Sequence, residues 1–285
     1  MELIVLGAAP AYTDRPGSAA SSYLLRAGDA ALLLDLGQGA FANLASTLEP
    51  STLTAVLVSH LHPDHFIDLV PLRHYLKWEF DPSRRVRVLG PAGLGERLDA
   101  LDGQAGFAAE ALDVERLSEG ARRVGPFEVE VRRVSHTDES YAFRVAVAVA
   151  DGASARQSGA DSGADTGASA GLATGASAGA AAGQSGASAG LVYSGDCARA
   201  EDLIPLIRAG DTLLSEASFG AGPVAAGAQH ITSADAARAA STGPAARLLL
   251  THILSGRSRT DILAAAQVAF EGPVQLVTEG DRFEI

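Results

Sequence analysis

Three of the seven histidines in this 285-residue chain lie within residues 60–65, whose sequence is His-Leu-His-Pro-Asp-His. Alternate residues of an extended segment point to the same side, so His60 and His62 can bind one metal ion. The proline that follows turns the chain, which lets Asp64 and His65 reach a second ion. Imidazole nitrogens and carboxylate oxygens suit zinc or a similar divalent metal. The segment therefore predicts a metal site, and a histidine-rich surface loop is the alternative.

Three further side chains of ligand type each follow a strand-like apolar run, and they are His136, Asp196 and His252. Such positions can gather at one rim of a sheet, so we expect these residues to meet residues 60–65. Any one of them alone would more often cap or hydrogen-bond the chain. Together with residues 60–65 they supply enough ligands for two metal ions, including a carboxylate able to bridge them.

Apolar runs alternate with helical stretches, and these elements must position the ligands. The expected strands are Leu3–Leu6, Ser22–Leu25, Ala31–Leu34, Ala55–Val58, Val86–Leu89, Phe127–Val134, Tyr141–Ala150, Leu191–Tyr193, Thr212–Leu214, Leu248–Leu250 and Val274–Val277. The expected helices are Ala40–Leu48, Phe66–Trp78, Arg199–Arg208, Ser233–Ala240 and Arg259–Phe270. Thr232 or Ser233 can cap the fourth helix, and Ser258 or Thr260 the last. His74 lies on the second helix, where a structural or surface role is expected. Strands followed by helices in both halves predict an α/β fold of two mixed sheets packed face to face, with outer helices.

Residues 151–190 break this pattern, because they are almost wholly Gly, Ala, Ser, Thr, Asp and Gln. Glycine recurs at every fourth position from 159 to 183, and a period of four excludes a collagen helix. The segment has too little apolar surface to offset its chain entropy. We therefore predict a disordered loop inserted in a single domain of residues 1–285.

Composition excludes some classes of function. The 34 acidic residues outnumber the 22 basic ones and give a net charge of −12, which disfavours a long nucleic-acid-binding surface. A small phosphate substrate needs only local positive charge, such as a metal. No apolar run approaches the roughly 20 residues that span a bilayer, so no membrane association is expected. Cys197 is the only cysteine and cannot form an internal disulfide, which favours a cytoplasmic location for the protein. We expect Cys197 to be a small buried side chain.

The order of the motifs resembles that of the metallo-β-lactamase fold hydrolases. The resemblance rests on the motifs His-x-His-x-Asp-His, a lone histidine, Ser-Gly-Asp and a late Thr-His. It extends over the chain from Leu3 to the last strand, except for residues 151–190. The resemblance implies an αββα sandwich and two divalent metal ions, taken as zinc with manganese, iron and magnesium as alternatives. It implies that the first ion is bound by His60, His62 and His136. The second would be bound by Asp64, His65 and His252, with Asp196 bridging the two ions.

Two segments resemble the ribonuclease Z-like branch of that family. Residues 214–219, Leu-Ser-Glu-Ala-Ser-Phe, are similar to its His-Glu-Ala-Thr segment, and residues 229–234, Gln-His-Ile-Thr-Ser-Ala, to its His-Ser-Thr segment. The resemblance implies that Glu216 orients His230, which protonates the leaving oxygen, and that Asp64 belongs to the catalytic set. It also implies a possible homodimer.

Within this branch, the chain most resembles small actinobacterial cyclic-nucleotide phosphodiesterases, through residues 22–26, 59–62 and 250–274. The favoured hypothesis is hydrolysis of a small phosphodiester, such as a cyclic nucleotide, by a hydroxide that bridges two metals. A ribonuclease Z-type tRNA 3′ endonuclease is an alternative. It is disfavoured because residues 151–190, in the place of that family's tRNA-binding arm, hold Arg156 against three aspartates. Thioesterase or lactamase chemistry and a non-enzymatic binding module are further alternatives.

Overall fold

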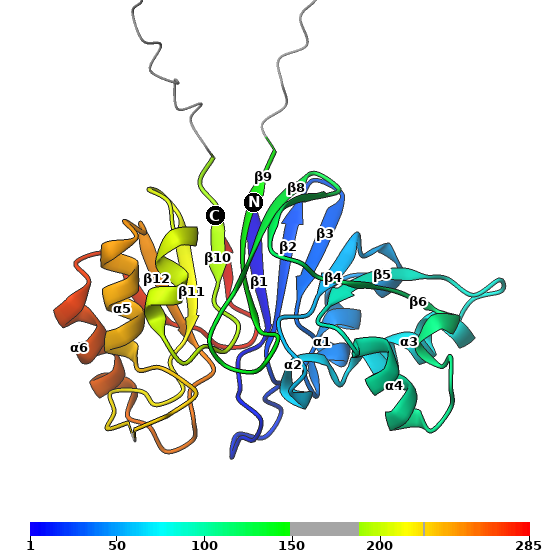
Figure 1. Cartoon of the computed structure of the whole chain (residues 1–285), viewed down its shortest axis with the longest axis horizontal. Coiled ribbons are helices and arrows are strands. Elements are labelled where there is room, and N and C mark those ends of the chain that lie inside the picture. Colours follow the sequence, from blue (N-terminus) through cyan, green and yellow to red (C-terminus); the bar gives the residue numbers. More distant parts are fainter. Residues whose placement is uncertain (149–187, 225) are drawn as a thin grey trace, which may run out of the picture.

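Leucine and valine dominate the central strands, because these strands are covered on both faces. In β1 (Glu2–Gly7), Leu3 and Val5 face the space between two sheets, whereas Ile4 and Leu6 face the outer helices. The computed structural model describes residues 1–148, 188–224 and 226–285. It shows two seven-stranded sheets packed face to face with helices on both outer surfaces, which confirms the predicted αββα sandwich (Figure 1).

The first sheet has the order β14-β1-β2-β3-β4-β5-β6. Its other strands are β2 (Ser22–Ala27), β3 (Ala30–Leu34), β4 (Ala55–Leu57), β5 (Val86–Gly90), β6 (Leu112–Arg116) and β14 (Arg282–Glu284). The second sheet has the order β13-β12-β11-β10-β9-β8-β7. Its strands are β7 (Gly120–Val124), β8 (Phe127–Arg133), β9 (Tyr141–Val147), β10 (Leu191–Tyr193), β11 (Thr212–Glu216), β12 (Arg247–Thr251) and β13 (Val274–Leu276). From β14 or from β7, each sheet has three antiparallel pairings followed by three parallel ones.

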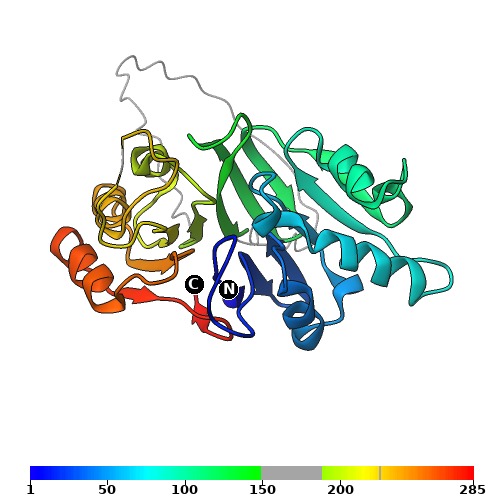
Figure 2. The same cartoon turned by 90° about the horizontal axis from the view of Figure 1, so that it is seen from below.

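Helices cover the outer face of each sheet (Figure 2). The helices that accompany the first sheet are α1 (Ala40–Thr47), α2 (Pro63–Phe66), α3 (Leu69–Trp78) and α4 (Leu94–Asp102), with short 3-10 turns η1 (Pro50–Thr52) and η2 (Ala108–Glu110). The second sheet is covered by α5 (Ser233–Thr242), α6 (Arg259–Ala269) and the 3-10 helix η3 (Ala200–Leu206). None of the helices in the described ranges combines the length and the apolar character that crossing a bilayer requires.

Several elements differ from their sequence predictions for local reasons. The helix expected over Phe66–Trp78 is interrupted between α2 and α3, because Pro71 has no N–H for a continuous helix and is tolerated only in a first turn. The helix expected over Arg199–Arg208 is the 3-10 helix η3, which contains Pro205. Helix α4 and strands β6, β7 and β14 were not predicted. The predicted disordered loop falls mainly on residues 151–187, which lie outside the described residues; Gly190 N–H donates to Asp211 Oδ1.

Candidate metal centre

The side chains of ligand type leave the sandwich at one end, each after a different strand or loop. His60, His62, Asp64 and His65 follow β4, and Pro63 starts α2 at the position where a missing N–H costs nothing. His136 lies between β8 and β9, Asp196 follows β10, and His252 follows β12. Gly195 has φ +56°, and a Cβ there would lie 2.7 Å from the Tyr141 carbonyl oxygen. A glycine is therefore required to deliver Asp196.

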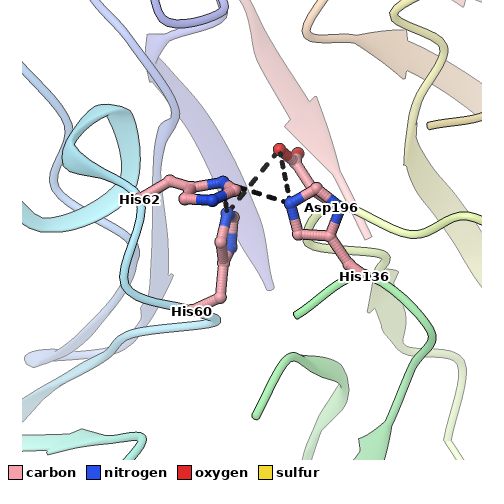
Figure 3. Close-up of side chains that lie close together, drawn as sticks. All are labelled: His60, His62, His136 and Asp196. Carbon is pink, nitrogen blue, oxygen red and sulfur yellow. Dashed lines mark hydrogen bonds and ion pairs between the residues drawn. The ribbon is translucent and has the colours of Figure 1, made fainter. Parts of the chain in front are cut away.

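The first cluster consists of His60, His62, His136 and Asp196 (Figure 3). His62 Nδ1 lies 3.1 Å from His60 Nε2 and 3.1 Å from His136 Nε2. Asp196 Oδ2 lies 3.7 Å from His60 Nε2 and 3.9 Å from His136 Nε2. In Figure 3, His60 and His62 approach from one side, and His136 and Asp196 approach from the opposite side.

The second cluster consists of Asp64, His65, His252 and, again, Asp196. His252 Nε2 lies 3.1 Å from Asp64 Oδ2 and 3.7 Å from Asp196 Oδ2. His65 Nε2 lies 3.4 Å from Asp196 Oδ2 and 3.7 Å from Asp64 Oδ2. The same oxygen of Asp196 therefore faces both clusters, as the predicted bridging role requires.

The donor atoms fit two divalent metal ions. Nitrogen or oxygen ligands at tetrahedral zinc are separated by about 3.3 Å, which matches the separations in both clusters. Within the described residues, His65 Nε2 and Asp196 Oδ1 are buried without a hydrogen-bond partner. A buried polar atom without a partner is costly, and a cation would satisfy the His65 nitrogen directly.

The charge of the centre also favours cations. Burial disfavours ionisation of Asp196, but His252 and His65 outweigh it and hold the pKa of this carboxyl well below its ordinary value. Burial likewise opposes ionisation of Asp64, yet its contact with His252 and the charge of His65 lower its pKa. Burial and the charge of His65 lower the pKa of His60. Burial opposes ionisation of His65, but Asp196 and Asp35 raise its pKa well above the ordinary value, so a metal ion at its Nε2 would replace a proton.

The buried carboxylate of Asp35, directly after β3, orients His65 and had not been predicted as a site residue. Its Oδ2 accepts hydrogen bonds from His65 Nδ1, Ser59 Oγ and Tyr193 Oη, each at 2.7 Å. Its Oδ1 accepts from Ser59 N at 2.6 Å. Because His65 donates through Nδ1, its Nε2 is the nitrogen left to bind an ion at the second cluster. The His136 ring is fixed similarly by donation from Nδ1 to the Gln229 carbonyl at 2.7 Å.

Glu216 and His230 lie beside the clusters, as the resemblance implied. His230 Nδ1 is 3.0 Å from Glu216 Oε1, and Glu216 is 1% exposed. Burial lowers the pKa of His230, but the hydrogen bond and the charge of Glu216 outweigh it and raise the pKa to about 9. The His230 side chain is 25% exposed, so a group outside the protein can reach it.

The comparisons with known proteins identify the family. The family described as Beta-lactamase superfamily domain matches residues 31–253. This chain belongs to the metallo-β-lactamase superfamily. The uncharacterized protein ML1173 of Mycobacterium leprae is 32% identical over 95% of this chain and 84% of its own length. The probable metallo-hydrolase YhfI of Bacillus subtilis is 23% identical over 92% of this chain and 91% of its own length.

Two crystal structures share the metallo-β-lactamase fold with this chain. The structure of Bacillus subtilis YhfI has a TM-score of 0.76 and covers 99% of both chains, at 23% identity. The short form of human tRNase Z has a TM-score of 0.63 at 21% identity, and the match covers 100% of this chain and 99% of the human one. At these identities the structures establish the fold alone. The family and the buried clusters together support the prediction of a metal-dependent hydrolase, and no name among these relatives specifies a cyclic nucleotide.

Residues outside the two clusters complete the comparison with the sequence predictions. All seven predicted metal ligands of this metallo-β-lactamase superfamily member lie in the two clusters. His74 lies on α3, exposed, with Nδ1 3.2 Å from the Val70 carbonyl oxygen, and belongs to neither. Cys197 is fully buried, as expected. The sequence signal that could have identified Asp35 is its place at the end of a buried strand, which it shares with Asp196.

Proposed function

We propose that this chain is a metal-dependent phosphodiesterase that hydrolyses a small phosphodiester, such as a cyclic nucleotide. The observation that carries the proposal is a proton donor held at the edge of the two clusters. His230 Nδ1 lies 3.7 Å from Asp196 Oδ2, the oxygen that faces both of them. A hydrolase whose leaving group is an alkoxide needs an acid at this position.

Glu216 holds His230 in the orientation that this role requires. Its Oε1 accepts from Cys197 N at 2.8 Å and from His230 Nδ1 at 3.0 Å, so the carboxylate is fixed by the backbone while it fixes the imidazole. The other ring nitrogen, Nε2, takes no part in these bonds and is left for the substrate. A histidine with a pKa of about 9 is protonated at neutral pH and can act as an acid.

The clusters and this pair divide the reaction between them. Two divalent ions held there would supply an activated water as nucleophile and would neutralise charge on the non-bridging phosphate oxygens. His230 donates a proton from Nε2 to the departing oxygen as the phosphorus–oxygen bond breaks. The products are then a phosphomonoester and a free hydroxyl, and Glu216 stabilises the imidazole throughout.

Processing of precursor tRNA is the second candidate, because human tRNase Z shares the fold. A protein that binds tRNA neutralises several phosphates with Lys and Arg. This chain has a net charge of −12 and a single lysine, Lys77, which favours a small substrate.

The proposal is tested with 3′,5′-cyclic AMP, bis-p-nitrophenyl phosphate and a precursor tRNA, each incubated with metal-loaded protein. We expect both small phosphodiesters to be hydrolysed, and His230→Ala to lower kcat by roughly 10²–10⁴-fold while both ions are retained. His74→Ala, which alters an exposed histidine outside the clusters, is the matched control and should retain full activity. Turnover of the aryl ester alone would exclude 3′,5′-cyclic AMP as the substrate. Turnover of the precursor tRNA would favour the second candidate. If none of the three compounds is hydrolysed, phosphodiester hydrolysis is refuted.

A further inference from the structure

The hydroxyl of Ser218 lies where the second cluster meets the Glu216–His230 pair. Ser218 is two residues beyond the end of β11 and is 1% exposed. Its Oγ lies 2.6 Å from Glu216 Oε2 and 2.9 Å from His252 Nδ1. It also lies 3.3 Å from His230 Nδ1. One hydroxyl therefore contacts a residue of the second cluster, the buried carboxylate and the proposed acid.

The direction of these hydrogen bonds follows from the number of protons. A serine hydroxyl has one proton to donate and two lone pairs. The Glu216 carboxylate can only accept, so the Ser218 proton points to Oε2, and the hydroxyl must accept from His252. His252 Nδ1 then carries a proton, and its Nε2 carries the lone pair. That Nε2 lies 3.1 Å from Asp64 Oδ2, and because both atoms are then acceptors, a cation between them would satisfy both.

Glu216 thereby acts on two histidines at once. Its two oxygens accept from Cys197 N, Ser218 N, Ser218 Oγ and His230 Nδ1, so its hydrogen-bonding capacity is filled. Polarisation passes along a chain of hydrogen bonds in a buried setting. The negative charge of Glu216 therefore makes the hydroxyl a better acceptor and His252 a stronger metal ligand.

We propose that Ser218 is a positioning residue: it fixes the tautomer of His252 for the second ion and couples that ion to the Glu216–His230 pair. The metal-binding half depends only on the geometry of the cluster. The coupling to His230 rests on the proposed function. The residue thus joins two parts of the site that the sequence motifs present as separate.

The test compares Ser218→Ala with the parent protein, each loaded with zinc and with cobalt(II). Competition with a chelator measures the affinity of each of the two ions, and visible absorption of the cobalt form reports the ligands. Ser233→Ala is the matched control, because Ser233 is fully buried and its Oγ has no hydrogen-bond partner among the described residues. Thermal unfolding verifies that each variant is folded.

We expect Ser218→Ala to lower the affinity for one of the two ions by roughly 10–100-fold and to change the cobalt spectrum. The affinity for the other ion should be nearly unchanged. Ser233→Ala should bind both ions as the parent does. Ser218→Thr and Ser218→Val have the same shape and differ only in the hydroxyl, so Thr should restore binding and Val should not. This pair also decides the matter if the alanine variant fails to fold.

The proposal would be overturned if Ser218→Ala or Ser218→Val bound both ions as tightly as the parent protein does and had the same cobalt spectrum as the parent. A parent protein that binds fewer than two ions would overturn it as well. Kinetics with bis-p-nitrophenyl phosphate at saturating metal test the coupling, which predicts a lower kcat with little change in KM for Ser218→Ala. If the parent binds two ions but hydrolyses no phosphodiester, the proposed function fails while the metal measurements still decide the role of Ser218.

Discussion

Replacing Asp35 by asparagine tests whether this buried carboxylate supports the metal centre or only the fold. Asp35 is fully buried and receives four hydrogen bonds from Ser59, His65 and Tyr193. An asparagine has one acceptor oxygen. If that oxygen takes the Oδ2 position, the new amide group faces Ser59 N–H, so one hydrogen bond is lost and two donors oppose each other.

The magnitude follows from these contacts. A hydrogen bond to a charged group contributes about 1.5–3 kcal/mol, and the three that remain lose their charge assistance. We therefore expect Asp35→Asn to reduce the free energy of unfolding by about 3–5 kcal/mol, the range for removal of one partner from a buried ion pair. The orientation of His65 is weakened at the same time, so the affinity for one metal ion should fall by roughly 10–100-fold.

Asp211→Asn is the matched control for this prediction. Asp211 is also fully buried and accepts from Arg144, Arg208 N and Gly190 N, but it belongs to neither cluster. Urea unfolding should show a comparable loss of stability in both variants. Chelator competition should show weaker metal binding only in Asp35→Asn. An Asp35→Asn protein that binds both ions as tightly as the parent would refute the role assigned to Asp35.

Three further predictions follow from the site. The value of kcat should fall as the pH rises through the pKa of His230, near 9, because only the protonated imidazole donates; a pH–rate profile should lose this limb in His230→Ala, and an unchanged limb would contradict the assignment. Metal analysis of His62→Ala should find about one ion per chain, whereas His74→Ala should retain two. Gly17 and Gly195 both have positive φ, but a Cβ at Gly17 meets open space. Gly17→Ala should therefore cost about 1–2 kcal/mol in denaturant unfolding and Gly195→Ala clearly more, and equal costs would argue against a steric requirement at Gly195.

Much of the site could be predicted from the sequence because its residues follow buried strands. The segment 60–65 holds four potential ligands, three histidines and an aspartate, within six positions, and the Ser-Gly-Asp and Thr-His motifs directly follow apolar runs. The cap of α5 is equally local, because the side chains of Thr232 and Asp235 each accept a hydrogen bond from the backbone N–H of the other residue. Local patterns of this kind are set by neighbouring residues and can be recognised in a single chain.

The features that the sequence did not predict depend on distant partners or weak patterns. Asp35 orients His65, 30 positions away, and also accepts a hydrogen bond from Tyr193, which is 158 positions away on the other sheet. Strands β6 and β14 lie at the edges of the first sheet and bury few side chains, so their apolar pattern is faint. Helix α4 buries only Leu94 and Leu98 and is flanked by Gly93 and Gly103. Ser218 lies in the segment 214–219 that resembles the His-Glu-Ala-Thr motif, but its contact with His252, 34 positions away, could not be predicted from that motif.

The separation of the ligands along the chain has a consequence for biosynthesis. Asp64 and His252 meet across 188 positions, so the second cluster is complete only after His252 has left the ribosome and both sheets have formed. Contacts of such long range form late and slowly in folding. An ion that binds only the finished arrangement shifts the equilibrium toward it by mass action. Metal supply would then set not only how many molecules are active but also how many survive proteolysis during their first minutes.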